Sequence, residues 1–271
     1  MIINHNMNAL NAHRNMTSNT ATAGKSMEKL SSGLRINRAA DDAAGLSISE
    51  KMRSQIRGLD QATRNAQDGI SYIQTAEGAT NEISSMLTRL KELSVQASTG
   101  TYNGDDKANI GQEMKALGTA ANEIITNTKF NGIDVFNKDT TITYGEDAGT
   151  NITIKQLTKD KFDILKGLTD GADVADGTGA VAVTVKAVED AITELNTSRA
   201  VYGAQQNKLE HVINNQNTTE ENLQASESRI RDVDMAKEMM TFSKNNILQQ
   251  AAQAMLAQAN SQPQGVLQLL R

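Results

Sequence analysis

Residues 56–97 read IRGLDQATRNAQDGISYIQTAEGATNEISSMLTRLKELSVQA. Along this stretch, most of the positions spaced three or four residues apart hold a small or apolar residue. The repeating positions are Ile56, Leu59, Thr63, Ala66, Ile70, Ile73, Glu77 and Thr80 and, after a shift of one residue, Ile83, Leu87, Leu90, Ser94 and Ala97. This spacing puts one stripe along one face of a helix, as in coiled coils. We therefore expect one helix from about Ala43 to Ser98, roughly 80 Å long.

Two more helical patterns follow a turn cluster at 98–106. Residues 110–124 carry apolar side chains at spacings of four and three. From Val185 to Ile230 the same alternation runs as long as the first pattern, with polar or charged residues at several of its positions. Polar positions in such a seam set its register more than they stabilise it. The matched lengths favour antiparallel packing of the two long helices.

Signals for strands are confined to the stretch between the second and third patterns. KFNGIDVF at 129–136 contains Asn-Gly, a strong signal for a hairpin turn. TITY at 141–144 and NITIKQL at 151–157 predict a second small hairpin. The expected fold class is therefore mostly α, a long antiparallel helical coiled-coil rod with a small β-hairpin region.

The composition narrows the function classes. Aromatic residues make up 3% of the 271 residues, proline occurs once and cysteine is absent, so the helices rely on small and aliphatic side chains. A net charge of −5 argues against a general nucleic-acid binder, which needs a concentrated basic face. No run of apolar residues is long enough for us to expect membrane insertion. The N-terminal residues do not resemble a Sec-type signal peptide, so we expect any export to use another route.

No residue pattern in the chain is typical of catalysis or of metal binding. The histidines, His5, His13 and His211, share no metal-ligand spacing, and no thiolate site can form without cysteine. No GxSxG elbow and no phosphate-binding glycine loop is present. We therefore expect neither an enzyme nor a cofactor.

The stretch RINRAADDAAGLSIS at 35–49 allows three interpretations. A capped helix start explains Asp41 and Asp42, because carboxylates there accept from free amides and complement the helix dipole. It explains the arginines less well, because cations at this end oppose the dipole. A catalytic carboxylate pair is the weakest interpretation, since adjacent helical residues point in different directions. We favour a subunit interface, formed by Arg35, Asn37, Arg38, Asp41 and Asp42.

Both ends of the chain are rich in amide side chains. Residues 244–264 contain nine Asn and Gln between Ala, Met and Leu, and residues 4–19 are rich in Asn. Helices with so few strong apolar anchors are not expected to be stable alone. We therefore expect both ends to gain order against copies of themselves or a partner.

Several long stretches resemble bacterial flagellin. They are MIINHN at the start, MEKLSSGLRINRAADDAAGLSISEKMRSQIRGL (27–59), NAQDGISYIQTAEGA (65–79), KFNG (129–132) and ESRIRDVDMAKEMMTFSKNNILQQAAQAMLAQANSQPQGVLQLLR (227–271). The resemblance covers roughly 1–137 and 185–271. It implies an N-terminal filament-core helix (1–40) paired with a C-terminal one (232–271), a rod in two parts (41–137 and 181–231), and a short variable outward-facing β/loop region (138–180).

The resemblance implies a secreted, extracellular structural protein that self-assembles into the bacterial flagellar filament for motility. It also implies export of the unfolded chain through the flagellar type III channel. Expected partners are other copies of the chain, hook-associated and cap proteins, and an export chaperone that holds about 232–271. Chaperone and neighbouring subunits are expected to share the apolar residues Ile247, Leu248, Met255, Leu256, Val266, Leu267 and Leu270.

Flagellins are also sensed by a Toll-like receptor through a segment QRVRELxVQ and a glutamate on the next helix. Here residues 88–96 read TRLKELSVQ, so the resemblance implies receptor contacts from Arg89, Leu93 and Glu113. Thr88 and Lys91 depart from the family pattern. Core packing is the competing explanation for Leu93.

Two other functions compete with a filament subunit. A hook–filament junction protein shares the arrangement of terminal helices, but the full stretches at 35–49 and 228–240 favour flagellin. A flagellin that carries a protease in its variable region is an alternative of another class. The absence of HExxH and the insert of about 40 residues argue against it.

Overall fold

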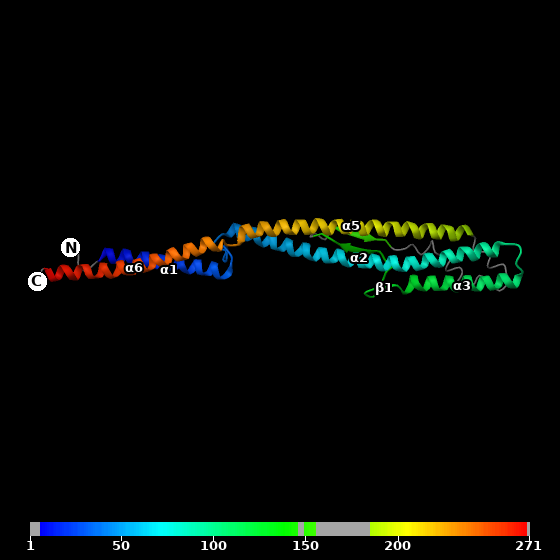
Figure 1. Cartoon of the computed structure of the whole chain (residues 1–271), viewed down its shortest axis with the longest axis horizontal. Helices are drawn as coiled ribbons and strands as arrows, with labels where there is room; N and C mark the ends of the chain where they lie inside the picture. Colours follow the sequence, from blue (N-terminus) through cyan, green and yellow to red (C-terminus); the bar gives the residue numbers. More distant parts are fainter. Residues whose placement is uncertain (1–5, 146–148, 156–184, 270–271) are drawn as a thin grey trace. The chain divides into compact units, whose positions relative to one another are not determined.

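The computed structural model describes residues 6–145, 149–155 and 185–269, with side chains as far as Gln262. In chain order the elements are α1 (Met7–Ser32), α2 (Ala43–Ser98), α3 (Gly104–Asn127), β1 (Lys129–Phe130), β2 (Ile133–Asp134), β3 (Thr140–Thr143), β4 (Asn151–Ile154), α5 (Val185–Arg231) and α6 (Met235–Leu269) (Figure 1). The bounds of α2 are the ones that its spacing predicted.

The chain forms two compact units, and each contains segments from distant parts of the sequence. The first consists of Met1–Ile56 with Glu221–Arg271, and the second is Arg57–Glu220. We call them the terminal unit and the central unit. Both units take part of α2 and part of α5, because the boundaries at Ile56 and Glu221 fall inside these two helices.

In the central unit, α2 and α5 run antiparallel. The hydroxyl of Thr63 donates to Oε1 of Gln216 at 3.1 Å, and Nζ of Lys91 lies 3.0 Å from Oε1 of Glu189. Residue numbers therefore rise along α2 as they fall along α5. This confirms the antiparallel packing that the matched lengths predicted.

The core of the central unit lies along the predicted stripes. The buried residues of this part of α5 recur mostly every seven positions, and they are Val188, Ala191, Leu195, Tyr202, Leu209 and Gln216. The stripe residues Ala66, Ile73, Ile83 and Leu87 of α2 form one buried cluster with Ala191, Leu195, Tyr202 and Leu209 of α5. A seven-residue repeat keeps the seam facing its partner over many turns. On α3 the buried row ends at Ile125, while the predicted Ile124 is half-buried.

The two predicted hairpins are present. β1 pairs with β2 across Asn131 and Gly132, whose φ angles of 50° and 79° suit a type I′ turn. β3 pairs antiparallel with β4, with Ile142 opposite Ile152. The end of the predicted strand NITIKQL and the rest of the outer region, residues 156–184, lie outside the described residues.

Helix side chains hold the β3–β4 hairpin in place. Nδ2 of Asn65 donates to the carbonyl of Thr143 at 3.2 Å, and Nε2 of Gln205 donates to that of Thr153 at 3.1 Å. The Nε2 of Gln216 donates to the carbonyl of Tyr144. These amides satisfy carbonyl groups that a two-stranded sheet leaves open at its edges.

In the terminal unit, α1 and α6 lie side by side and run antiparallel (Figure 1). Leu34 and Asp232 form an antiparallel bridge beside one end of the pair, and Nδ2 of Asn6 donates to the carbonyl of Ala259 at 2.7 Å near the other.

Over the described ranges, no helix has the length and hydropathy needed to cross a bilayer.

Candidate assembly surface

The N-terminal helix ends at a glycine that turns the chain toward the C-terminal segment. Gly33 has a φ of 72°, in the left-handed region that glycine adopts without a Cβ clash. Its N–H donates to the carbonyl of Lys29 at 2.9 Å, and its carbonyl accepts from the N–H of Val233 at 3.0 Å. The same glycine therefore caps α1 and pairs with the chain just before α6.

Arg35 continues this pairing and contacts its own chain. Its N–H donates to the carbonyl of Arg231 at 2.6 Å, and its Nε donates to that of Ile230 at 3.1 Å. Those carbonyls lie in the last turn of α5, where a helix leaves acceptors unsatisfied and favours a cation. The arginine that the helix-start explanation left unexplained thus caps the C-terminus of a different helix.

Arg38 makes a more exposed contact. Its Nε lies 2.9 Å from Oε1 of Glu28 on α1, and the two side chains are 73% and 41% exposed. A pair this exposed contributes about 0–1 kcal/mol. The guanidinium of Arg38 therefore adds little to folding and stays accessible to another molecule.

The two aspartates of this stretch perform different tasks. Oδ1 of Asp42 accepts from the N–H of Gly45 at 2.9 Å and caps the start of α2, as predicted. Oδ2 of Asp41 instead closes the preceding loop, because it accepts from the N–H groups of Arg38 at 3.0 Å and Asn37 at 3.2 Å. The hydrogen bond from the Arg38 backbone is the main cause that holds the pKa of Asp41 below its ordinary value.

Asn37 is half-buried in this loop. Its buried Nδ2 has no hydrogen-bond partner within the part of the chain that the structure describes. A buried donor of this kind costs free energy unless it finds an acceptor.

Large apolar side chains are exposed mainly on the terminal unit. In the described ranges they are Met7, Leu10, Met27, Ile48, Met235, Met239, Met240, Ile247, Leu248 and Met255, against Val95, Tyr102, Ile133 and Val201 on the central unit. Exposed apolar groups gathered in this way are typical of surfaces that bind another protein. We call the exposed apolar residues of the terminal unit the apolar surface.

The predicted C-terminal contacts fall into three groups. Ile247, Leu248 and Met255 belong to the apolar surface, and Leu256 is half-buried. For Val266 and Leu267 the structure describes the helix but not the side chains, and Leu270 lies outside the described residues.

The sequence interpretation missed seven members of the apolar surface, Met7, Leu10, Met27, Ile48, Met235, Met239 and Met240. The sequence marks them only by the absence of a core-forming pattern. They lie in helical segments whose apolar residues belong to none of the stripes that build the central core.

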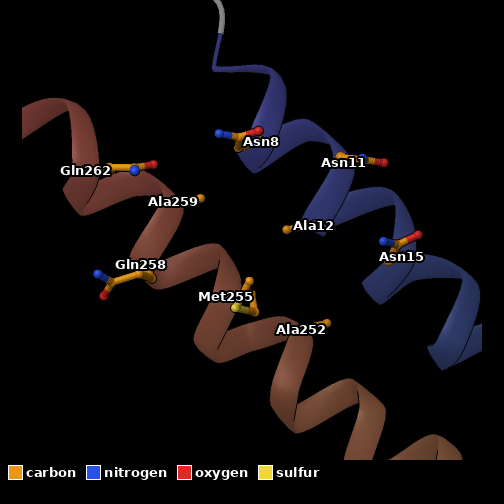
Figure 2. A pocket seen from close by; sticks show the side chains of 9 residues that line it. All are labelled: Asn8, Asn11, Ala12, Asn15, Ala252, Met255, Gln258, Ala259 and Gln262. Carbon is orange, nitrogen blue, oxygen red and sulfur yellow. The ribbon is translucent and has the colours of Figure 1, made fainter.

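A groove of about 460 Å³ lies between α1 and α6. It is lined by Asn8, Asn11, Ala12, Asn15, Ala252, Met255, Gln258, Ala259 and Gln262. Figure 2 shows the side chains of Asn8 and Gln262 extending toward each other, with Met255 and Ala12 on the facing sides of the two helices. Amide groups can donate and accept hydrogen bonds, so this lining offers polar contacts beside a small apolar patch.

The predicted receptor residues separate into a surface pair and a core residue. Nη2 of Arg89 lies 2.9 Å from Oε1 of Glu113 and Nη1 lies 3.0 Å from Oε2 of Glu92, so α2 and α3 are joined by an ion pair. Hydrogen bonds to the carboxylates of Glu92 and Glu113 raise the pKa of Arg89 above its ordinary value. Leu93 is only 2% exposed and packs in the core, which favours the packing explanation for that residue.

No group of three His, Asp or Glu side chains able to hold a metal ion occurs within residues 6–145, 149–155 and 185–262. Arg35, Asp41 and Asp42 use polar groups in caps and backbone contacts, Arg38 forms an exposed ion pair, and Nδ2 of Asn37 has no partner among the described residues. These contacts fix the backbone of 35–49 and leave the guanidinium of Arg38 exposed, as expected for a residue that contacts another protein.

Comparison with known proteins identifies the relatives of the chain. Residues 3–141 match the bacterial flagellin N-terminal helical region, and residues 185–270 match the bacterial flagellin C-terminal helical region. The chain is similar to a flagellin of Halalkalibacterium halodurans (53% identity) and to a flagellin of Bacillus subtilis (49% identity), each alignment covering 100% of both chains. A solved structure of a putative flagellar hook-associated protein from Vibrio parahaemolyticus shares the fold, with a TM-score of 0.56 and 9% identity over 71% of this chain and 100% of that one.

Proposed function

The chain belongs to the bacterial flagellin family, and we propose that the apolar surface of its terminal unit joins neighbouring subunits in the flagellar filament. Flagellin is a family of structural proteins, so the chain is a structural subunit of that filament, the extracellular part of the flagellum, and serves motility. The fold alone would not separate it from hook-associated proteins. The sequence identity over the whole chain does.

The observation that carries the proposal is the concentration of exposed apolar side chains on α1 and α6. Burying one Ile, Leu or Met side chain completely contributes about 1.5–3 kcal/mol. Several such side chains from each subunit can together offset the loss of translational and rotational freedom on association, about 4–15 kcal/mol. In an isolated chain these apolar side chains remain exposed to water, and this stabilisation is absent.

The bridge at Leu34 and Asp232 supports a paired role for the two ends of the chain. We propose that 1–40 and 232–271 form the filament core, 41–137 and 181–231 form the rod, and 138–180 faces outward. Within this division Arg35 and Asp42 hold the junction, and Asn37, Arg38 and Asp41 present polar groups to a neighbouring subunit. Hook-associated and cap proteins would then meet the same terminal segments at the ends of the filament.

Deletion of 232–271 tests the assembly proposal directly. The truncated chain is expected to remain soluble and helical, since the central-unit core lies in 57–220, and to form no filaments. An internal deletion of 158–180, in the proposed outward region, is expected to leave polymerisation intact. Polymerisation is measured by sedimentation and electron microscopy. Normal filaments from the chain without 232–271 would contradict the proposal.

The exposed residues of α6 also support a role in export. We propose that the chain passes unfolded through the flagellar type III channel, with a chaperone covering 232–271 beforehand. Ile247, Leu248 and Met255 would be shared between the chaperone and filament neighbours, so the two could not bind together. Calorimetry should show that a purified flagellar export chaperone binds the full chain. The double variant Ile247→Ser, Leu248→Ser should lose this binding.

Receptor recognition is proposed for the surface pair on the central unit. Arg89 and Glu113 would contact the Toll-like receptor, and Leu93 would act by packing beneath them. Arg89→Ala should reduce signalling in a receptor reporter assay, whereas Arg64→Ala, which removes an ion pair of similar exposure with Asp60, should not. Equal signalling by both variants would contradict this role.

A further inference from the structure

Methionines make up much of the apolar surface, and the two units differ sharply in how they expose this residue. The chain contains eleven methionines. In the described ranges six of them are between 48% and 67% exposed, all in the terminal unit: Met7, Met27, Met235, Met239, Met240 and Met255. Met16 and Met52 of the terminal unit are half-buried, and on the central unit Met86 is half-buried and Met114 is 0% exposed. Thioether groups open to solvent are thus found where the proposed filament contacts lie.

Three of these residues gather at the start of α6. Met235 and Met239 are four positions apart, so they lie on the same face of the helix, and Met240 follows Met239 about 100° further around the helix axis. The pairing of Val233 with Gly33 fixes the chain just before this point. We call Met235, Met239 and Met240 the methionine cluster.

We propose that the methionine cluster is a redox modification site, at which peroxides oxidise the thioethers and thereby block assembly of the subunit. The sulfur lone pair attacks one peroxide oxygen, an S–O bond forms and the O–O bond breaks. Each sulfur loses two electrons and becomes a sulfoxide, while the rest of hydrogen peroxide leaves as water. This inference rests on the proposed role of the terminal unit in the filament.

The chemistry of the product explains the block. A thioether is apolar and flexible and suits a packed helix contact, whereas a sulfoxide is polar and chiral and disrupts Met-rich interfaces. Burying the sulfoxide oxygen against a neighbour without a hydrogen-bond donor costs free energy. A subunit that has already joined the filament should be protected, because the neighbour covers the same sulfurs.

The test compares the full chain as monomer and as filament after treatment with hydrogen peroxide, followed by peptide mass spectrometry. In the monomer the cluster should be oxidised well before Met114, which serves as the internal control. In filaments oxidation of the cluster should slow by about tenfold or more, because access controls the rate. The treated monomer should need an about tenfold or higher concentration to polymerise.

Two matched variants assign the effect. The variant M235L/M239L/M240L should polymerise, and peroxide should raise the concentration it needs by much less than it does for the unchanged chain, since only Met7, Met27 and Met255 remain exposed for oxidation. The variant M7L/M27L/M255L keeps the cluster, so it should lose assembly as the unchanged chain does. A loss of assembly in the first variant equal to that of the unchanged chain, or normal assembly of a chain with a fully oxidised cluster, would overturn the proposal.

Reversal supplies an independent measurement that does not depend on substitution. Methionine sulfoxide reductases return the sulfoxide to the thioether, so treating the oxidised chain with both epimer-specific enzymes should restore polymerisation. If the chain still failed to polymerise after all its sulfoxides had been reduced, oxidation of the methionine cluster could not be the cause of the block. A failure of the assembly proposal itself has a different signature, since the untreated chain would then polymerise without 232–271.

Discussion

Ile142 packs its Cδ1 against the bare backbone of Gly69, where an added Cβ would stand 2.5 Å from that atom. Gly69→Ala should therefore displace the Ile142 side chain, and the cost of overpacking less the helix gain of alanine should destabilise the central unit by about 1–2 kcal/mol. Gly78 lies on the same helix with nothing within 4 Å of the added Cβ. Gly78→Ala should stabilise it by about 0.5–1 kcal/mol, because alanine favours helices. Urea unfolding followed by circular dichroism should give opposite signs, and shifts of the same sign would contradict this packing.

The stability of the central unit should fall at alkaline pH because of one buried phenol. Burial raises the pKa of Tyr202 from 10.0 to about 12. The folded chain holds this proton more tightly than the unfolded chain, so the stabilisation is complete below pH 10 and disappears as pH rises toward 12. The expected loss is about 2–3 kcal/mol. Tyr202→Phe cannot ionise there, so its unfolding free energy should fall less over the same range. Parallel pH profiles for the two chains would show that Tyr202 is not responsible.

The exposed ion pair of Arg38 should matter more for assembly than for folding. Arg38→Ala removes a contact with Glu28 worth about 0–1 kcal/mol, so the melting temperature should change little. Filament formation, measured by sedimentation, should decrease, because the guanidinium is proposed to contact a neighbouring subunit. Arg64→Ala removes a comparable exposed pair with Asp60 and should leave both properties unchanged. If Arg38→Ala lowers melting temperature and assembly to the same extent, Arg38 has only a structural role.

The long helices and the hairpins were predictable because their signals are local. The three- and four-residue spacing of α2 and the Asn-Gly pair at 131–132 act within one or two turns of chain. Tyr72 lies off the predicted stripe but is buried in the core with Val135 and Phe136, and its hydroxyl donates to the carbonyl of Val135 at 3.1 Å. No spacing rule in α2 anticipates a contact with a hairpin more than sixty residues away.

The candidate site was predictable only in outline. The capping role of Asp42 follows from its place before a helix, and the structure confirms it. The partner of Arg35 is the carbonyl of Ile230, 195 positions away, and only the three-dimensional pairing of the two ends reveals it. Of the exposed methionines only Met255 was predicted among the described residues, because exposure depends on which helix faces find a partner within the chain.

Substitution of one exposed apolar residue on α6 tests the assembly surface without removing a segment. Ile247 is 65% exposed on α6, and Val201 is 43% exposed on α5 in the central unit. Both should accept serine with little change in monomer stability, because neither side chain is buried in the chain itself. The measurement is the lowest subunit concentration that forms filaments, determined by sedimentation for Ile247→Ser, Val201→Ser and the unchanged chain. We expect that concentration to rise by about tenfold for Ile247→Ser and to stay unchanged for Val201→Ser. Equal values for all three chains would contradict the assignment of the terminal unit as the assembly surface.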